Sequence, residues 1–432
     1  MNDGLKLKKA TYHLWTFTAS KMISTFGAQV YAFAISFYIL KMTGSASSFA
    51  TNLICNILPR TLIGPFAGYI ADTYSRKVIV IAAQLVSTVA ILGLLLYSLF
   101  YTLSLPAIYI TTVILSIAST FSSVGFTSSI TGLVDEKRIQ KAMSLNQMAS
   151  SMAAVVSPAI GGVLYGAVSI PFFLAIYGVA SLLGAIIEST MNFSLFANRN
   201  VEKSTVAKES MFASIKDGVS YIRLQPILMA IIWTALLVNF FMGALQVGYS
   251  FLLIEKLKII SSHFGIIEGA MAAGMLFISG YLAARKEFQS PLIISKRGIA
   301  GLGILMSLVT LPLLVPLPYE GMFAFYASLS LLNGALLPLI NTPLQVLMMK
   351  LIDDDYKGRV FSILETMAMA LMPAAMILFG FLYDVLPAPW ILFGSSFLLI
   401  LTVSILMRPS VIRNATTLDQ KPVNEQTNRA IS

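Results

Sequence analysis

The feature that most constrains this chain is a series of long apolar runs separated by short polar segments. A run of about 18–20 apolar residues crosses the hydrocarbon core of a bilayer as an α-helix, which satisfies its own backbone hydrogen bonds there. We expect twelve such spans, at residues 11–40, 46–70, 77–103, 106–133, 143–166, 170–194, 226–254, 261–284, 298–317, 321–349, 360–384 and 389–407. The sequence therefore predicts an all-α, multi-pass membrane protein.

Composition agrees with this fold class and excludes several functions. Only 11% of the 432 residues are charged and 57% are hydrophobic, whereas soluble domains carry about 25% charged residues. The single cysteine, Cys55, lies inside an apolar run, so we expect neither an intramolecular disulfide nor a metal site. No phosphate-binding loop and no catalytic constellation are found, so we expect neither an ATP-driven pump nor an enzyme.

The net charge of +10 reports membrane topology rather than nucleic-acid binding. Most of the 29 lysines and arginines lie in segments on the side of the two termini, and the opposite side holds only Lys41, Lys256 and Lys258. Basic residues accumulate in cytoplasmic loops. We therefore expect cytoplasmic termini and no nucleic-acid partner.

One long polar interval divides the spans into six and six. We expect an N-terminal bundle at 1–194, a cytoplasmic linker at 195–225, a C-terminal bundle at 226–408 and a disordered tail at 409–432. Within the linker, the amphipathic stretch Met211–Leu224 is expected to lie along the membrane surface.

The two halves also resemble each other in sequence. A shift of 218 residues places 133–135 (Leu-Val-Asp) on 351–353 (Leu-Ile-Asp) and 164–165 (Leu-Tyr) on 382–383 (Leu-Tyr). Both of the polar segments concerned put acidic residues first and basic residues after them. The repeat predicts two pseudo-symmetric six-helix bundles related by an axis along the membrane normal.

A polar turn between the second and third spans carries the most informative motif. It contains Gly68, then Asp72 four residues later, then the basic pair Arg76 and Lys77. Glycine allows two helices to approach closely, and an acid can interact favourably with a neighbouring helix N-terminus or a cation. Any loop between spans can carry a few charges, so the order of the residues is the informative part.

This order resembles the loop 2–3 signature of the major facilitator superfamily, with Thr73 and Ser75 replacing a basic residue and a glycine of the pattern. The resemblance implies the twelve-helix major facilitator fold, alternating access and a substrate site near mid-membrane between the halves. It also implies that Asp72 acts as a conformational latch against the start of span 11, at Gly358 and Arg359. The corresponding loop 8–9 has Ala284 where the acid would be.

A second motif lies in the fifth span. Ser157 and Pro158 are followed by the pair Gly161 and Gly162, a pattern similar to the antiporter motif of drug-exporting facilitators, with serine in place of its first glycine. Proline permits a kink and the glycines permit close helix packing. Packing alone is the alternative explanation, because both residues are common in membrane helices.

Five ionisable residues lie within the expected spans, where charges are costly and often functional. Glu365 and Glu268 are the candidates for proton coupling, because a carboxyl group in apolar surroundings can take up a proton near neutral pH. Lys21 and Arg60 are candidates for lining a cavity, and Glu188 is expected to snorkel from the cytoplasmic end of span 6. A structural pair or an interfacial position is the alternative for each.

Within the superfamily, the chain most resembles the macrolide-efflux branch of drug:proton antiporters, on segments 41–46, 58–65 and 356–362. This resemblance implies a proton-coupled exporter of small amphipathic organic compounds in a bacterial plasma membrane. It would act as a monomer, with a proton gradient and no cofactor. The alternatives are a facilitator for a native metabolite (a siderophore, lipid or peptide) and a transport-dead membrane scaffold or receptor.

Overall fold

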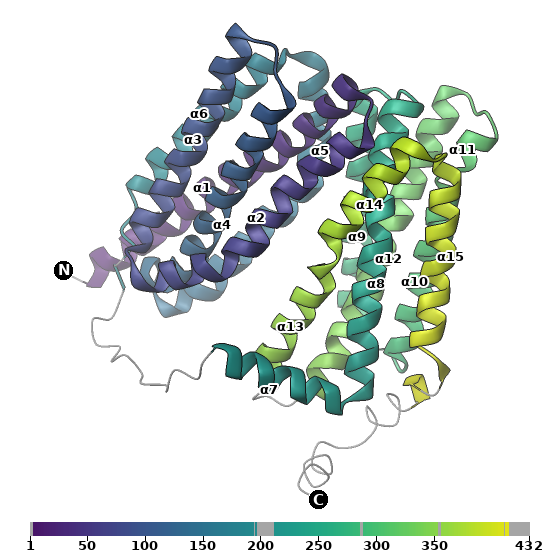
Figure 1. The fold of residues 1–432 in the computed structure, drawn as a ribbon. Helices are drawn as coiled ribbons and strands as arrows, with labels where there is room; N and C mark the ends of the chain where they lie inside the picture. The colour runs from purple at the N-terminus through teal and green to yellow at the C-terminus, as the bar shows by residue number, and fades with distance from the viewer. Residues whose placement is uncertain are drawn as a thin grey trace, which may run out of the picture. The chain divides into compact units, whose positions relative to one another are not determined.

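The computed structural model describes residues 3–193, 195–196, 211–285, 288–352, 356–409 and 411–413. Over these residues the chain is almost entirely helical and contains no β-strand (Figure 1). It forms two compact units, a first unit of Met1–Glu202 with Ser250–Gly269 and a second unit of Lys203–Tyr249 with Ala270–Ser432.

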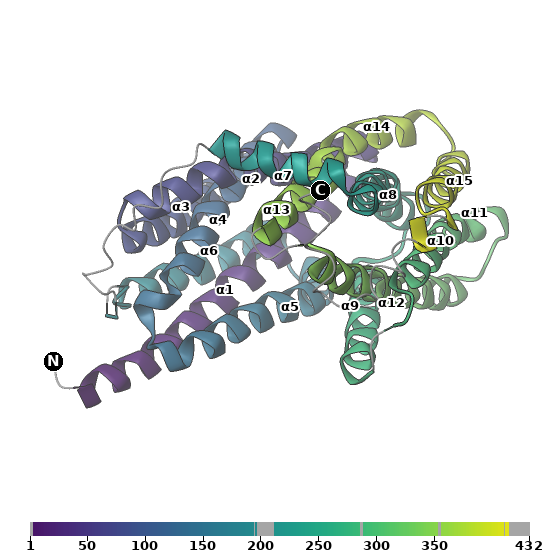
Figure 2. The ribbon, with the colours of Figure 1, turned by 90° about the horizontal axis from the view of Figure 1, so that it is seen from below.

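The first unit is built on six helices and one shorter segment from later in the chain. The six helices are α1 (Asp3–Thr43), α2 (Ala46–Thr73), α3 (Arg76–Phe100), α4 (Leu105–Leu133), α5 (Glu136–Ala167) and α6 (Ile170–Ser189). The later segment holds the end of α8, the π-helix η1 (Leu252–Lys256) and the first part of α9 (Ser261–Ala284). Within this unit α1 packs against α5 and α6, and α3 packs against α4 and α6 (Figures 1 and 2).

The second unit holds the rest of the helices. They are α7 (Met211–Leu224), α8 (Pro226–Phe251), α10 (Pro291–Leu308), α11 (Leu311–Leu314), α12 (Tyr319–Leu351), α13 (Lys357–Ala370), α14 (Met372–Val385) and α15 (Ala388–Leu406), with the remainder of α9. Helix α10 packs against α12 and α15. The stretch expected to be amphipathic is α7, which packs on α13 with Tyr221 stacked on Tyr356 at 4.4 Å between ring centroids.

Ten helices of the described chain are long and apolar enough to cross a membrane. The two remaining expected spans correspond to α2 and α5, helices of 28 and 32 residues. The all-α, membrane-spanning fold class is therefore confirmed.

Three expected spans differ in detail from the helices. Span 11 is broken at Leu371, where α13 ends and α14 begins with Pro373 in its first turn, because proline lacks a backbone donor and clashes with the preceding helical turn. Span 7 ends in the π-helix η1. Span 9 begins earlier than expected, at Pro291, and is followed by the separate short helix α11.

Helix boundaries follow local sequence signals. Gly44 ends α1 with a positive φ of 62°, and Ser45 caps α2 by accepting a hydrogen bond from the Ser48 N–H through its side chain. Helices α4, α6, α10, α14 and α15 each begin with proline in the first two positions, where its missing N–H costs no helical bond.

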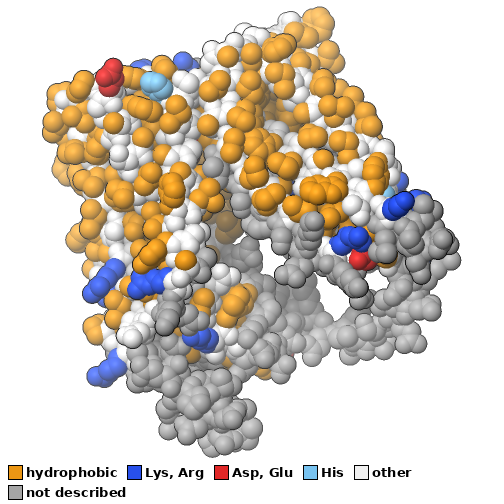
Figure 3. Space-filling view, turned by 180° about the vertical axis from the view of Figure 1, so that it is seen from behind, with side chains coloured by type: hydrophobic (Ala, Val, Ile, Leu, Met, Phe, Trp, Pro, Cys, Tyr) orange, Lys and Arg blue, Asp and Glu red, His pale blue; other side chains and the backbone are white. Residues whose placement is uncertain are grey.

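Apolar side chains fill the interior of each unit and also cover most of its described outer surface. Buried Ile35, Ile91 and Leu174 belong to one core of the first unit, and Ile299, Leu347 and Leu399 to the core of the second. Figure 3 shows that hydrophobic side chains dominate the visible described surface of both units. A surface of this kind suits contact with lipid rather than water.

The expected domain boundaries stay predictions. Most of the linker between α6 and α7, and the tail apart from residues 409 and 411–413, lie outside the described residues. The compact units differ from the expected bundles in one respect, since Ser250–Gly269 associates with the first unit.

Candidate functional site

The polar turn after α2 places its lysine at the end of another helix. The Lys77 ammonium donates a 2.8 Å hydrogen bond to the backbone carbonyl of Ser189, the last residue of α6. Helix C-termini carry unsatisfied carbonyls and partial negative charge, so a cation is stabilising there. Arg76 begins α3.

The proposed latch itself is not visible. The surroundings of Gly68 and Gly358, and the side chains of Asp72 and Arg359, lie outside what the structure describes. The latch role of Asp72 therefore stays a prediction.

The glycines of α5 are sites of very close backbone approach. A Cβ atom on Gly162 would lie 2.3 Å from the Ser261 carbonyl oxygen, and one on Gly265 would lie 2.5 Å from that of Pro158. A Cβ on Gly161 would lie 2.9 Å from the Phe33 ring. Gly162 and Gly265 let the backbones of α5 and the start of α9 approach each other directly, and Gly161 leaves room for the Phe33 side chain of α1.

Ser157 adds a polar group to this part of α5. It is fully buried, and its hydroxyl has no hydrogen-bond partner within the part of the chain that the structure describes. The assignment of Ser157, Pro158, Gly161 and Gly162 as an antiporter-type kink remains a prediction. The structure shows which residues its glycines contact.

Aromatic rings from three helices gather beside these glycines. Phe264 of α9 stacks on Phe33 at 5.4 Å and lies 6.0 Å from Phe37, both on α1. Phe37 in turn lies 4.8 Å from Tyr165 of α5. The cluster joins the segment Ser250–Gly269 to α1 and α5.

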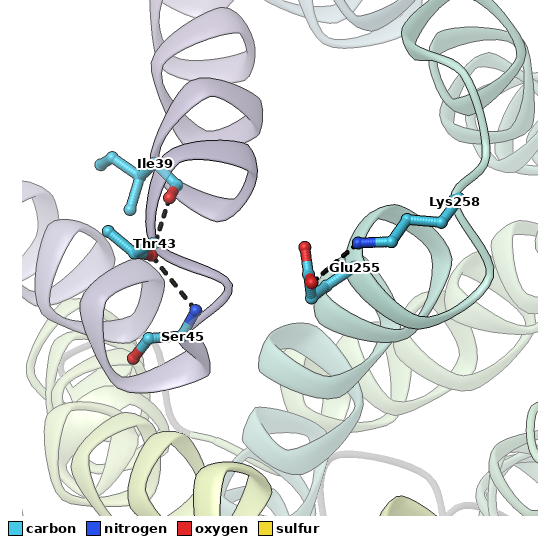
Figure 4. A network of polar contacts seen from close by, with 5 residues as sticks. All are labelled: Ile39, Thr43, Ser45, Glu255 and Lys258. Atoms are coloured by element: carbon cyan, nitrogen blue, oxygen red, sulfur yellow. Dashed lines mark hydrogen bonds and ion pairs between the residues drawn. The ribbon is translucent and has the colours of Figure 1, made fainter.

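The same segment lies beside the end of α1, and each of the two has its own polar contacts (Figure 4). Thr43 donates its hydroxyl to the Ile39 carbonyl at 2.8 Å and accepts the Ser45 N–H at 3.2 Å, which holds the turn at Gly44. Glu255 pairs with Lys258 at 2.8 Å, and a Cβ atom on Gly44 would lie 3.4 Å from its Oε1.

Glu188 does not snorkel, and that expectation was wrong. Its side chain is 0% exposed and accepts a 2.7 Å hydrogen bond from the Ser20 hydroxyl of α1. Its position on α6 decides this, since Ser181, Gly184 and Glu188 recur at helical spacing on the face that packs against α1 and α3.

A polar network continues along this face toward the middle of the helices. The Gln84 amide of α3 donates to the Ser181 hydroxyl at 2.9 Å and to its carbonyl at 3.1 Å. Thr88 and Ser181 share a further hydrogen bond of 2.9 Å, and Ser24 of α1 donates to Gln84 at 3.5 Å. Sequence reasoning missed this network, although the small and polar stripe on α6 was a usable signal.

Of the other ionisable residues within the spans, Lys21 lies within electrostatic reach of Glu188 and Arg60, but no ion pair joins it to either in the described structure. Lys21 is half-buried, with its ammonium 6.0 Å from the centre of the Phe126 ring, and Arg60 is exposed. Glu268 is half-buried in α9 and has no hydrogen bond or ion pair to any described residue. Glu365 lies in α13, and its side chain is outside the described residues.

Comparison with known proteins decides the family. The family model described as Major Facilitator Superfamily matches residues 17–375. The chain belongs to the major facilitator superfamily. It is a multi-pass membrane transporter and not an enzyme, as the sequence predicted.

The chain is also similar to several bacterial relatives and solved structures. It is 24% identical to macrolide efflux protein A of Streptococcus pyogenes over 373 residues, which cover 86% of this chain and 89% of the relative. It is 27% identical to the uncharacterized MFS-type transporter YfiS of Bacillus subtilis, over 82% of each chain. A bacterial homologue of the iron transporter ferroportin, solved in an inward-facing state, has the same fold, with a TM-score of 0.67 at 16% identity over 94% of this chain and 99% of the other.

Proposed function

We propose that this facilitator is a proton-coupled exporter of small amphipathic organic compounds of the macrolide type. The observation that carries the proposal is the similarity to macrolide efflux proteins over most of both chains. The bacterial relatives and the distribution of basic residues support a bacterial plasma membrane with cytoplasmic termini.

The packing of α5 supports a working transport cycle. Alternating access requires helices that separate and rejoin, and contacts between glycine backbones interlock few side chains that would resist separation. Gly162 and Gly265 make such a contact, with the Phe33, Phe37 and Phe264 rings beside it. A transport-dead scaffold has no need of this arrangement.

Proton coupling requires a carboxyl group within the spans. Glu268 and Glu365 remain candidates, and Lys21 and Arg60 supply positive charge in the first unit. A gradient of protons, with no bound cofactor, would supply the energy. The site at Glu188 is argued separately below.

The test is proton movement in everted membrane vesicles that contain the chain. Addition of a macrolide or a cationic dye to energised vesicles is expected to release protons from the lumen, and vesicles without the protein should not respond. Asp72→Asn is expected to lose the response if the latch operates.

Gly162→Leu tests the contact on α5 in the same assay. We expect it to abolish transport, because a side chain cannot fit 2.3 Å from the Ser261 carbonyl. Gly394→Leu is the matched control, since nothing lies within 4 Å of a Cβ atom there. No proton movement with any compound, in protein that is folded by size-exclusion chromatography, would reject coupled export in favour of a metabolite facilitator or a scaffold.

A further inference from the structure

The buried carboxyl group of Glu188 is unusual because only one of its two oxygens is satisfied. Oε1 accepts the Ser20 hydroxyl, whereas Oε2 is buried without a hydrogen-bond partner among the described residues. The side chain has no exposed surface. A carboxylate left charged in such a place is costly, and neutralisation by a proton or by a close cation removes that cost.

A cation lies within electrostatic reach but does not pair with it. Lys21 follows Ser20 on α1, and its charge interacts with that of Glu188. Its ammonium nevertheless lies over the Phe126 ring, and no ion pair joins it to Glu188 in the described structure. Either a proton or the nearby Lys21 ammonium can thus neutralise the Glu188 carboxylate.

The helices packed around α6 carry further charged and titratable groups. Among the described groups are Lys21 and His13 of α1, Lys77 of α3 and Arg138 of α5, with Arg60 of α2 acting on Lys21. Lys77 is bound to the Ser189 carbonyl, and Arg138 is paired with Asp135. Of these groups, Lys21 is the one whose charge acts on the Glu188 carboxylate.

His13 marks a direction in which a proton could travel. It lies seven residues before Ser20 on α1, about 10.5 Å along the helix toward its N-terminus. It is 4% exposed, and neither ring nitrogen has a partner among the described residues. A titratable ring therefore lies between Glu188 and the N-terminal end of α1.

We propose that Glu188 is a proton-binding site inside the first unit, in which a proton and the Lys21 ammonium compete to neutralise the same carboxylate. Ser20 positions the carboxyl group and stabilises its charged form. The site deepens the proposed function, because it names a group on which a proton gradient would act. It involves none of the residues first expected to carry the proton.

The test is pH-dependent infrared difference spectroscopy of the purified full-length chain in lipid nanodiscs, from acidic to alkaline buffer. We expect a protonated-carboxyl stretching band at acidic pH that disappears as the buffer becomes alkaline. This band should be absent in Glu188→Gln, whose amide still accepts the Ser20 hydrogen bond, and present in the control Glu268→Gln.

Two neighbouring variants separate a proton site from a merely structural carboxyl group. Lys21→Met removes the competing cation and Ser20→Ala removes the donor to the charged form, so in each the band should persist to more alkaline buffer than in the wild type. A spectrum that is identical in wild type and Glu188→Gln, or a transition that neither neighbour shifts, would overturn the site.

The vesicle assay keeps this proposal distinct from the proposed function. A Glu188 band in a chain that moves no protons with any compound would establish the proton site and reject coupled export. If Glu188→Gln keeps both substrate-driven proton movement and the protonated-carboxyl band, the site is overturned and coupled export stays in place.

Discussion

The α3–α6 interface of the first unit and the α10–α15 interface of the second are formed by helices that correspond in the internal repeat, but their interiors differ in polarity. The shift of 218 residues places Gln84, Thr88 and Ser181 on Leu302, Met306 and Leu399. The first three form a buried hydrogen-bonded network. The second three are buried apolar side chains.

The same contrast holds at a second pair of positions, where α6 meets α1. Ser20 and Glu188 correspond to Val238 and Leu406, so the second unit has no carboxyl group and no hydroxyl at these positions. The α10–α15 pair is thus packed mainly by apolar side chains, with one buried bond from the Ser396 hydroxyl to the Gly303 carbonyl at 2.6 Å, whereas several polar side chains join in a network between α3 and α6. Interhelical hydrogen bonds in membranes contribute only about 0.6 kcal/mol on average. We therefore expect the polar network to be dispensable for folding, which favours a function for it in the first unit.

The largest expected effect is on transport. Glu188→Gln should reduce substrate-driven proton movement in everted vesicles to the background of vesicles without the protein, because the amide cannot take up and release a proton. Leu406→Gln places the same amide at the corresponding position of the second unit and should leave proton movement unchanged. Equal losses in the two variants would mean that polarity at these helix ends, and not proton binding, determines activity.

The second effect concerns stability, which opposite substitutions in the two units should lower by different amounts. Leu302 is 2% exposed, so Leu302→Gln buries an amide without partners and should cost about 1–3 kcal/mol of unfolding free energy. Gln84→Leu removes the hydrogen bonds to Ser181 but leaves the Thr88–Ser181 bond, and should cost less than about 1 kcal/mol.

Unfolding in detergent, followed by tryptophan fluorescence, measures this pair of variants. A lower midpoint for Leu302→Gln than for Gln84→Leu is the expected order. The reverse order would show that the polar network is a structural necessity of the first unit, and the contrast between the interfaces would lose its functional meaning.

The sequence was sufficient for the fold and insufficient for the proton site, for a physical reason. Apolar runs of spanning length predict helices because a lipid-exposed backbone has few other choices, and every expected span has a helix in the structure. The direction in which a side chain points depends on helix rotation, which a charge near the end of a span does not reveal. Glu188 was expected to reach the membrane surface, but it faces Ser20 because α6 turns its small and polar stripe toward α1 and α3.

Glu365 and Asp72 illustrate the complementary case. Their chemistry made them candidates from sequence, but their side chains lie outside the described residues, so their roles are still predictions. Glu268 is described, and the structure gives it neither a cation nor a hydrogen-bond donor among the described residues. Among the described carboxyl groups within the spans, Glu188, which was expected to snorkel, is thus the one with a hydrogen-bond donor and a nearby cation.

The smallest expected effect tests what the two units share. Lys77 donates to the Ser189 carbonyl at the end of α6, and Lys296 of α10 donates to the Met407 carbonyl at the end of α15, both at 2.8 Å. Each lysine satisfies a free carbonyl and places a cation at a helix C-terminus, an interaction that contributes about 0.3–1 kcal/mol at low ionic strength. Lys77→Ala and Lys296→Ala should therefore lower the unfolding free energy by similar small amounts.

Salt dependence distinguishes this electrostatic contribution from lost packing, because the charge effect is screened when the Debye length shortens. The deficit of each alanine variant should shrink at high salt, and Lys77→Arg and Lys296→Arg should retain most of the stability. A deficit in only one unit would show that the lysines are not equivalent. Equal losses of unfolding free energy in Lys77→Ala and Lys296→Ala would show that the two units are alike at these helix ends. The difference between them would then lie in the buried polar groups of the first unit, which include Glu188.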